Sequence, residues 1–570
     1  MMVKKWRAML FSLAGLVFGL APNMPVYAQQ KIETNHEKLI KQGLTRIENH
    51  VEPLLKIEDV FLQAITDAEE PISATDSDER CFDIKQIVTE GVTVFSDEEL
   101  AKVSDPYVNQ CLGLHQINQL VSRFSNLYLM QGYITSRAYI KPQDLSTGTL
   151  SIVVLEGYIQ SIIDPSQGIS QKQLALSFPV EHGELLNLRD LEQGLENLNR
   201  LGQNKATTAL SPGDFQGSSV VVVNNNLSPF WRGGLSVSNT GVEETGLYQL
   251  DGYLIYDNLF GVNDSIIASF SSNIGEHDLP ESKSRSYSLI GNVPYGYWFL
   301  TVNGTYFEYG QTVLGNVANF LTHGTSLNTS VKVEHMLYRG ERDKVNIGAA
   351  FLRKENENFI EDVYLETSSR TLYIWQLSAD YTRYFSFGSL NGRVQIDHSV
   401  PWFDASTNLV DAELDYQFTK YQLDLTFSTS FDLWTQYVQY ITSIHILSSP
   451  EEILTSEGLS VGGRYSVRGI ANDSLFGYHG GYLRNDFNFP LQASWLNPVN
   501  LSLFTGLDVG VSNLPDYPDL DSEWMAGAIA GFRASYRRVN FSASYAKALR
   551  VPDILNAEEH VFDITLGINF

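Results

Sequence analysis

The spacing of apolar residues divides the chain into three parts. Near the N-terminus, apolar residues recur every three or four positions, as on one face of an amphipathic helix. They are Ile40, Leu44, Ile47, Val51 and Leu54. We therefore predict a helix within residues 29–60, with an N-cap at Asn35 and an end near Pro53. Residues 61–79 are acidic and rich in Ser and Thr, which is typical of a linker.

Two similar units follow, over residues 80–156 and 157–226. In the first, a strand near Cys81 precedes a helical stripe that Gly132 can end, and strands are expected at 136–140 and 150–155. In the second, a leucine stripe up to Leu201 precedes two strands that flank Pro212. The pattern predicts a duplicated α/β module. A pair of unrelated α+β domains is the alternative.

Over residues 227–570 apolar residues recur at every second position instead of every third or fourth. The last alternating segment places Phe562, Ile564, Leu566, Ile568 and Phe570 on one face. Such strands put one face in lipid and the other in water. A strand with its turn and loop needs about 20 residues, so this region accommodates about 16 strands, enough for a channel. A soluble β-sandwich also alternates, but the small polar residues of the second face and the length of the region favour a transmembrane antiparallel β-barrel.

Residues 1–28 are predicted to be a secretory signal peptide. Lys4, Lys5 and Arg7 precede an apolar stretch, and a small-x-small pattern ends at Ala28. An uncleaved anchor is the alternative, although the apolar stretch is short for a bilayer. No later stretch approaches the roughly 18 apolar residues that a transmembrane helix needs. The mature chain is therefore expected in the periplasm, outside the cell or in the outer membrane.

The composition of the chain limits the kinds of partner and of fold that we expect. A formal net charge of −27 argues against a nucleic-acid partner, because phosphate binding requires clustered Lys and Arg. An aromatic content of 12% at a mean hydropathy of −0.13 suits a barrel.

Cys81 and Cys111 are expected to form a disulfide in an oxidising compartment, which would stabilise the first module by about 3.5 kcal/mol in the chain-entropy model. Two free thiols or a redox pair are the alternative, without support from a C-x-x-C spacing.

The sequence lacks two common motifs of catalysis and nucleotide binding. It contains no H-E-x-x-H and no G-x-x-x-x-G-K-[ST] string, and its 11 histidines are scattered. We therefore expect no catalytic residues, no cofactor and no metal.

Several strings resemble a known family, the outer-membrane transporters of two-partner secretion. This TpsB class exports filamentous haemagglutinins, haemolysins and contact-dependent inhibition toxins. In the first module the resemblance is carried by residues 81–82, 111–114, 131–139 and 155–157, which are similar to a POTRA domain of this class. The second module resembles a second POTRA domain more loosely. In the barrel, residues 462–470 and 506–510 resemble two family motifs.

The resemblance implies a loop that folds into the lumen. Its motif residues are Gly463, Val467, Arg468, Gly469 and Ile470, and the matching barrel-strand motif is Gly506, Asp508 and Gly510. Arg468 is expected to pair with Asp508, because a bidentate Arg–carboxylate contact holds a loop well. Glycines at 462, 463 and 469 are expected to let the backbone approach the barrel wall. Ile470 replaces the usual Tyr or Phe, which puts the stacking role of that position in doubt. A solvated loop charge is the alternative for Arg468.

The family also implies a mechanism. The N-terminal helix would plug the lumen, although a linker or a coiled-coil stub has the same pattern. The POTRA modules would recognise a large unfolded exoprotein, which is usually encoded next to its transporter. Export would need no nucleotide and would be driven by folding outside the cell. We expect a monomeric pore in outer-membrane lipid, inserted by the barrel-assembly machinery with Phe570 as its C-terminal signal. A barrel-assembly or insertase relative on the same plan is the main alternative, and a passive porin is a third.

Overall fold

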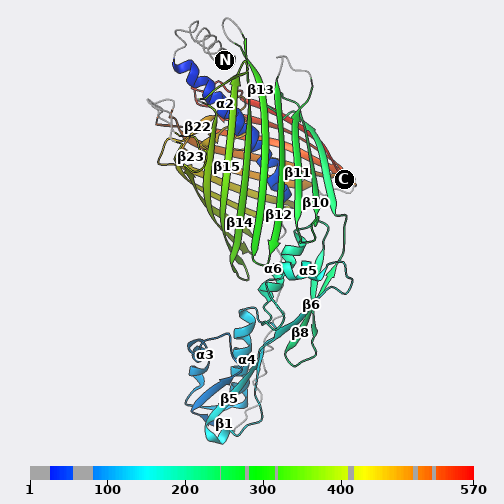
Figure 1. Cartoon of the computed structure of the whole chain (residues 1–570). Coiled ribbons are helices and arrows are strands. Elements are labelled where there is room, and N and C mark those ends of the chain that lie inside the picture. The colour runs from blue at the N-terminus through cyan, green and yellow to red at the C-terminus, as the bar shows by residue number, and fades with distance from the viewer. Residues whose placement is uncertain are drawn as a thin grey trace, which may run out of the picture.

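A barrel with two small modules below one of its ends makes up the molecule, and a helix crosses the barrel interior (Figure 1). The computed structural model describes residues 26–55, 81–243, 245–275, 282–314, 319–366, 368–407, 416–491, 498–515 and 521–570. Among these residues no helix is both long and apolar enough to cross a membrane. Most of the predicted signal peptide and the whole predicted linker lie outside the described residues.

The first module combines a three-stranded sheet with two helices. Its elements are β1 (Cys81–Ile84), β2 (Gln86–Glu90), α3 (Asp97–Ser104), β3 (Gln110–Gly113), α4 (Leu114–Met130), β4 (Arg137–Tyr139) and β5 (Thr149–Leu155). The sheet order is β2-β5-β4, and β1 pairs separately with β3. The expected disulfide joins Cys81 and Cys111 across this pair, with 5.2 Å between their Cα atoms. The bond therefore fixes the beginning of the module to the strand that precedes α4.

The second module repeats the plan. It contains β6 (Tyr158–Ile163), α5 (Gln171–Ser177), α6 (Leu188–Asn199), β7 (Ala206–Pro212) and β8 (Ser218–Asn225). The sheet order is β6-β8-β7, with β6 parallel to β8 and β7 antiparallel to it, as for β2, β5 and β4 in the first module. Each module has its own apolar core.

A closed antiparallel barrel of 16 strands forms the rest of the chain. Its strands are β9 (Trp231–Ser238), β10 (Gln249–Asp257), β11 (Ser265–Asn273), β12 (Lys283–Tyr295), β13 (Trp298–Leu314), β14 (Asn319–Arg339), β15 (Asp343–Ile360), β17 (Arg370–Phe385), β18 (Gly388–Val400), β19 (Thr419–Leu433), β20 (Gln436–Ser448), β23 (His479–Leu491), β24 (Asn500–Asn513), β25 (Ser522–Tyr536), β26 (Val539–Arg550) and β27 (His560–Asn569). A two-residue strand, β16 (Val363–Tyr364), pairs with the end of β15.

Alternation along β24 shows how the wall is built. Gly506, Asp508 and Gly510 are buried on the lumen side, whereas Leu507 and Val509 on the opposite face are exposed. The exposed face is apolar because it meets lipid, and the lumen face carries small or polar residues. The alternation along β24 therefore tells which of its side chains face the lumen.

Strand β27 closes the barrel against β9. The two strands pair antiparallel over five residues, from Thr565 to Asn569. The terminal Phe570 exchanges two backbone hydrogen bonds with Gly233, each 2.9 Å long, and its ring lies 5.9 Å from that of Trp231. The end of the chain is thereby fixed at the closing seam, and a role of Phe570 as an assembly signal stays a prediction.

Helix α2 (Val26–Leu55) is longer than the sequence predicted. Asn35 lies inside the helix rather than capping it, and Pro53 lies two residues before its end. The expected N-cap at Asn35 was wrong, because Asn inside a helix is only weakly unfavourable and does not by itself start one. The expected end near Pro53 agrees with the observed end at Leu55. Leu44 and Leu54 pack in the lumen as expected, whereas the side chains of Ile47 and Val51 lie outside the described residues.

Candidate functional site

Residues 449–478, between β20 and β23, form a folded loop inside the barrel. We call this segment the inward loop. Its two short strands, β21 (Leu459–Val461) and β22 (Leu475–Gly477), pair with each other and lie close to β24. Leu454, Val467 and Ile470 are almost completely buried in one cluster with wall residues such as Met525. The inward loop is therefore a small folded unit with its own core.

Arg468 is the most extensively bonded side chain of the inward loop. Its Nε and Nη2 donate to the two carboxylate oxygens of Asp508, both at 2.6 Å, and its backbone N–H donates to the same carboxylate at 3.0 Å. Its Nη1 donates to Asp486 on β23. Arg468 is 7% and Asp508 4% exposed. The structure thus brings together the two residues that the sequence paired, and it adds Asp486, which the sequence analysis did not select.

Glycines of the inward loop and of the barrel wall allow this close contact. Gly469 has φ +91°, and a Cβ there would overlap the backbone of Lys547 on β26. On the wall, a Cβ at Gly506 would overlap the guanidinium of Arg468, and one at Gly527 would overlap its carbonyl oxygen. Gly510 similarly leaves room for Val467.

Not every loop glycine behaves as expected. Gly463 has open space around its Cα, so the expected close approach to the wall is wrong there. Its φ of +100° explains the residue instead, because a side chain disfavours that backbone conformation. Gly462 also has a positive φ, +115°, and a Cβ there would lie 3.3 Å from the sulfur of Met525 on the wall. Ile470 is 1% exposed within the apolar cluster, so this position contributes packing.

Two further anchors of the inward loop escaped the sequence analysis. Arg464 donates from Nη2 to Asp563 of β27 at 2.7 Å and from Nε to both oxygens of that carboxylate. Glu457 accepts hydrogen bonds from Lys354 of β15 at 2.7 Å and from Lys420 of β19 at 2.8 Å. Together with Asp508, these contacts reach four strands around the barrel. The inward loop therefore bridges the lumen rather than lying along one side.

Helix α2 lies in the lumen beside the inward loop. Ile40 is fully buried against wall residues such as Ile255, and a Cβ at Gly43 would overlap the ring of Phe307. Arg46 donates to both carboxylate oxygens of Asp251 on β10 at 3.0 Å. On this side of the lumen the helix thus contacts the wall through an apolar patch and an ion pair.

A second set of contacts joins the helix to the inward loop. Glu37 accepts from Arg370 of β17 and, at 3.1 Å, from the backbone N–H of Ser456. Lys41 donates to the carbonyl of Gly458, and Lys38 lies 3.5 Å from Asp473. The side chains of Glu37 and Arg370 are 7% and 2% exposed. This buried pair makes Glu37 the junction of helix, inward loop and wall.

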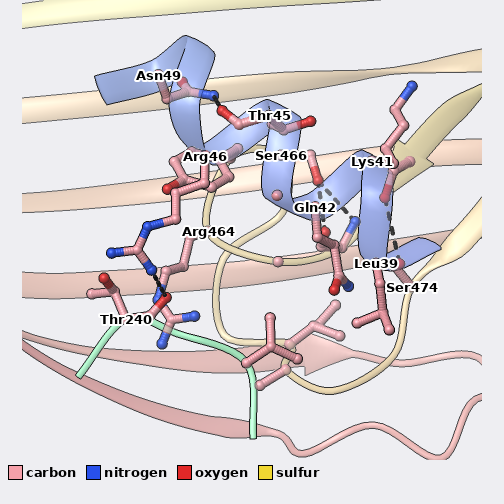
Figure 2. Close-up of a pocket in the computed structure, with 18 of the residues that line it drawn as sticks. Leu39, Lys41, Gln42, Thr45, Arg46, Asn49, Thr240, Arg464, Ser466 and Ser474 are labelled. Atoms are coloured by element: carbon pink, nitrogen blue, oxygen red, sulfur yellow. Dashed lines mark hydrogen bonds between the residues drawn. The ribbon is translucent and has the colours of Figure 1, made fainter. Parts of the chain in front are cut away.

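A cavity of about 600 Å³ remains between these elements. Figure 2 shows Arg46 of the helix and Arg464 of the inward loop extending toward the same side of the cavity, near Thr240. Its lining also includes Gln422 of β19 and Glu457. Within the described residues, no group of three or more His, Cys, Asp or Glu side chains is placed to hold a metal ion. The barrel interior is therefore occupied by two segments of the same chain, with a cavity between them.

Comparison with protein families gives three matches. A family model described as haemolysin secretion/activation protein ShlB/FhaC/HecB matches residues 217–534. A POTRA domain model of ShlB type matches residues 82–157, and a further POTRA domain model matches residues 159–212.

Individual relatives agree with these matches. The outer membrane transporter CdiB of Escherichia coli is 30% identical over 86% of this chain and 83% of its own length. The haemolysin transporter ShlB of Serratia marcescens is 28% identical over 83% of each chain. The solved structure of CdiB from Escherichia coli superimposes with a TM-score of 0.82 at 26% identity, covering 95% of this chain and 98% of that one.

Proposed function

Because this chain belongs to the haemolysin secretion/activation family, the outer-membrane transporters of two-partner secretion, we propose that it exports a large unfolded exoprotein through its barrel lumen. We call that exoprotein, encoded beside the transporter, the client. The barrel lies in the outer membrane and the POTRA modules lie in the periplasm. The names of the relatives support a haemolysin or an inhibition toxin as the class of client. The proposal involves no catalytic step.

One observation carries this proposal: the lumen is occupied by α2 and the inward loop, two segments that are not part of the barrel wall. The wall lines the lumen with small and polar side chains along β24 and with apolar side chains such as Ile255 and Phe307 where α2 packs. Residues 56–80 separate α2 from the first module, so the helix can leave while the modules stay in place. A barrel of 16 strands is wide enough to hold a channel once it is vacated.

Energy for export would come from the client. A folded domain is stable by about 5–15 kcal/mol, so folding outside the cell prevents return through the pore. The chain contains no nucleotide-binding string, and export on this account requires none.

The edge of β7 is suited to receive the client. Among the residues that the structure describes, strand β7 pairs only with β8, and most of its side chains are exposed. The opposite edge of the sheet is covered, because Ile159 of β6 exchanges two backbone hydrogen bonds of 2.8 Å with residues 183–184. An extended client segment can therefore add to β7 through main-chain hydrogen bonds.

Proline substitution tests this site. Backbone N–H groups along β7 point alternately toward β8 and away from it, so Ala209→Pro and Leu210→Pro remove donors on opposite sides. We expect the variant that loses the outward donor to bind the unfolded N-terminal segment of the client about fivefold more weakly, because one hydrogen bond contributes about 1 kcal/mol. Binding is measured with the full-length transporter in nanodiscs.

The adjacent variant serves as the matched control, since it disturbs the pairing with β8 and leaves the outward donor in place. Equal affinity of wild type and both variants would exclude β7 as the binding edge.

A further inference from the structure

Helix α6 of the second module lies between that module's core and the barrel. One face of the helix is apolar and packs in the core through Leu191, Leu195 and Leu198. The other face carries Glu192, Gln193, Glu196 and Asn197, which are also buried. Buried carboxylates are costly unless they are paired. The polar face must therefore meet cations. Arg189 of the same helix donates to Glu192 at 2.6 Å, and the other cations come from the barrel.

The cations flank the turn between β14 and β15. Glu196 accepts from Lys344 at 2.7 Å and from Arg339 at 2.9 Å, and Glu192 lies 3.3 Å from Arg339. The side chains of Arg339, Lys344, Glu192 and Glu196 are 1%, 3%, 0% and 6% exposed. Burial by itself would raise the pKa of Glu196, but Lys344 and Arg339 outweigh it and lower the pKa. Two buried acids of the module and two buried bases of the barrel thus compensate one another's charge.

Two more barrel turns are bound by the same module. Asn197 donates to the carbonyl of Gly296 at 2.7 Å, and Tyr297 donates to Asp190 at 2.5 Å, both at the turn between β12 and β13. Asn263, between β10 and β11, donates to Ser177 of α5 at 2.8 Å. Contacts with three turns restrict rotation of the module in more than one direction.

The first module is joined to the second with similar constraint. Asn187 donates to the carbonyl of Gln131 at 3.0 Å, and the N–H of Leu188 donates to Gly132 at 2.8 Å. Ile134, from the first module, packs against the core of the second. The two modules therefore form a single arm whose angle to the barrel is determined at α6.

We propose that Glu192 and Glu196 are positioning residues for export. Through Arg339 and Lys344 they hold the POTRA arm at one angle to the barrel, so that a client segment bound to the arm reaches the lumen from the side of β10–β15. This inference rests on the proposed export function, and it adds that delivery depends on a rigid arm. A freely swinging arm would spread the bound segment over many positions and lower its effective concentration at the lumen.

Charge exchange provides the test. We expect Glu196→Lys to place three cations together, release the arm and reduce export of the client at least tenfold. The exchanged pair Glu196→Lys with Lys344→Glu restores opposite charges and should restore export. If Glu196→Lys does not assemble, Glu196→Gln removes the charge with little change of shape and should give a smaller loss in the same direction.

Arm angle is measured separately from export, by pulsed electron spin resonance on the full chain in nanodiscs. Spin labels are attached through Ser146→Cys in the first module and Thr435→Cys in the turn between β19 and β20, both exposed positions. Cys81 and Cys111 are joined to each other and do not react with the label. The distance distribution should be narrow in wild type, broad in Glu196→Lys and narrow again in the exchanged pair.

Barrel assembly is checked in every variant by heat-modifiable migration. A broadened distribution with unchanged export would overturn the proposal, as would lost export with an unchanged distribution. Absence of export by the wild type would instead refute the proposed function, and the distance measurement would still report whether the ion pairs fix the arm.

Discussion

Export of the client is expected to fall at least tenfold in Arg468→Ala, with the barrel still inserted. The substitution removes the guanidinium contacts to Asp508 and Asp486, and only the backbone N–H of residue 468 still donates to Asp508. Breaking a buried ion pair by removing one partner costs about 3–5 kcal/mol, which is enough to release the inward loop from the wall. Export into the medium is compared by immunoblotting with wild type and with cells lacking the transporter.

Two control variants separate the effect of the bidentate contact from the effect of the positive charge at position 468. Arg468→Lys keeps the positive charge but cannot form the bidentate contact, so export should be intermediate. The double variant Arg468→Ala with Asp508→Ala removes a buried charge from each side and should assemble better than Arg468→Ala while exporting no better. Wild-type export by Arg468→Ala would show that the contact does not hold a functional loop.

Loss of Glu37 is expected to open the lumen. In Glu37→Ala the buried Arg370 loses its carboxylate partner, and Ser456 loses a hydrogen bond from its N–H. At about 3–5 kcal/mol for a broken buried pair, the ratio of vacated to occupied lumen should rise about a hundredfold or more. Planar-bilayer recordings should show a larger and longer-lasting conductance than wild type.

Asn49→Ala is the matched control on the same helix, since Asn49 is exposed and, in the described part of the chain, its side chain donates only to the carbonyl of Thr45 in the same helix. Conductance equal to wild type in Glu37→Ala would contradict the role of α2 as a displaceable plug.

Much of the fold could be predicted because each element carries a local periodic signal. In β24, alternation alone places Asp508 in the lumen and Val509 in lipid. The leucines of α6 likewise predict a helix packed on a sheet. The inward loop has no such signal, because Leu454, Val467 and Ile470 are irregularly spaced and become a core only when the barrel surrounds them.

The site was predictable where a motif resembles a family pattern and not elsewhere. Arg468 and Asp508 each lie in such a motif, so their contact could be expected. Glu457, Arg464 and Glu196 are charged residues in ordinary sequence surroundings. Their partners are 37 to 148 residues away along the chain, and only the closed barrel brings them together. In helix α2 the local signal was itself misleading, since Asn35 is of a type that favours an N-cap but lies inside the helix.

The most direct test of lumenal export is site-specific photo-crosslinking during export of a stalled client. Gln422 faces the lumen cavity, whereas the adjacent Tyr421 faces lipid with 48% exposure, so the two positions form a matched pair on β19. Leu566, 49% exposed on the lipid face of β27, reports on the closing seam. Passage through the lumen predicts client adducts from position 422 and none from 421 or 566. Adducts from 566 without any from 422 would contradict the account and favour an insertase that acts at the seam.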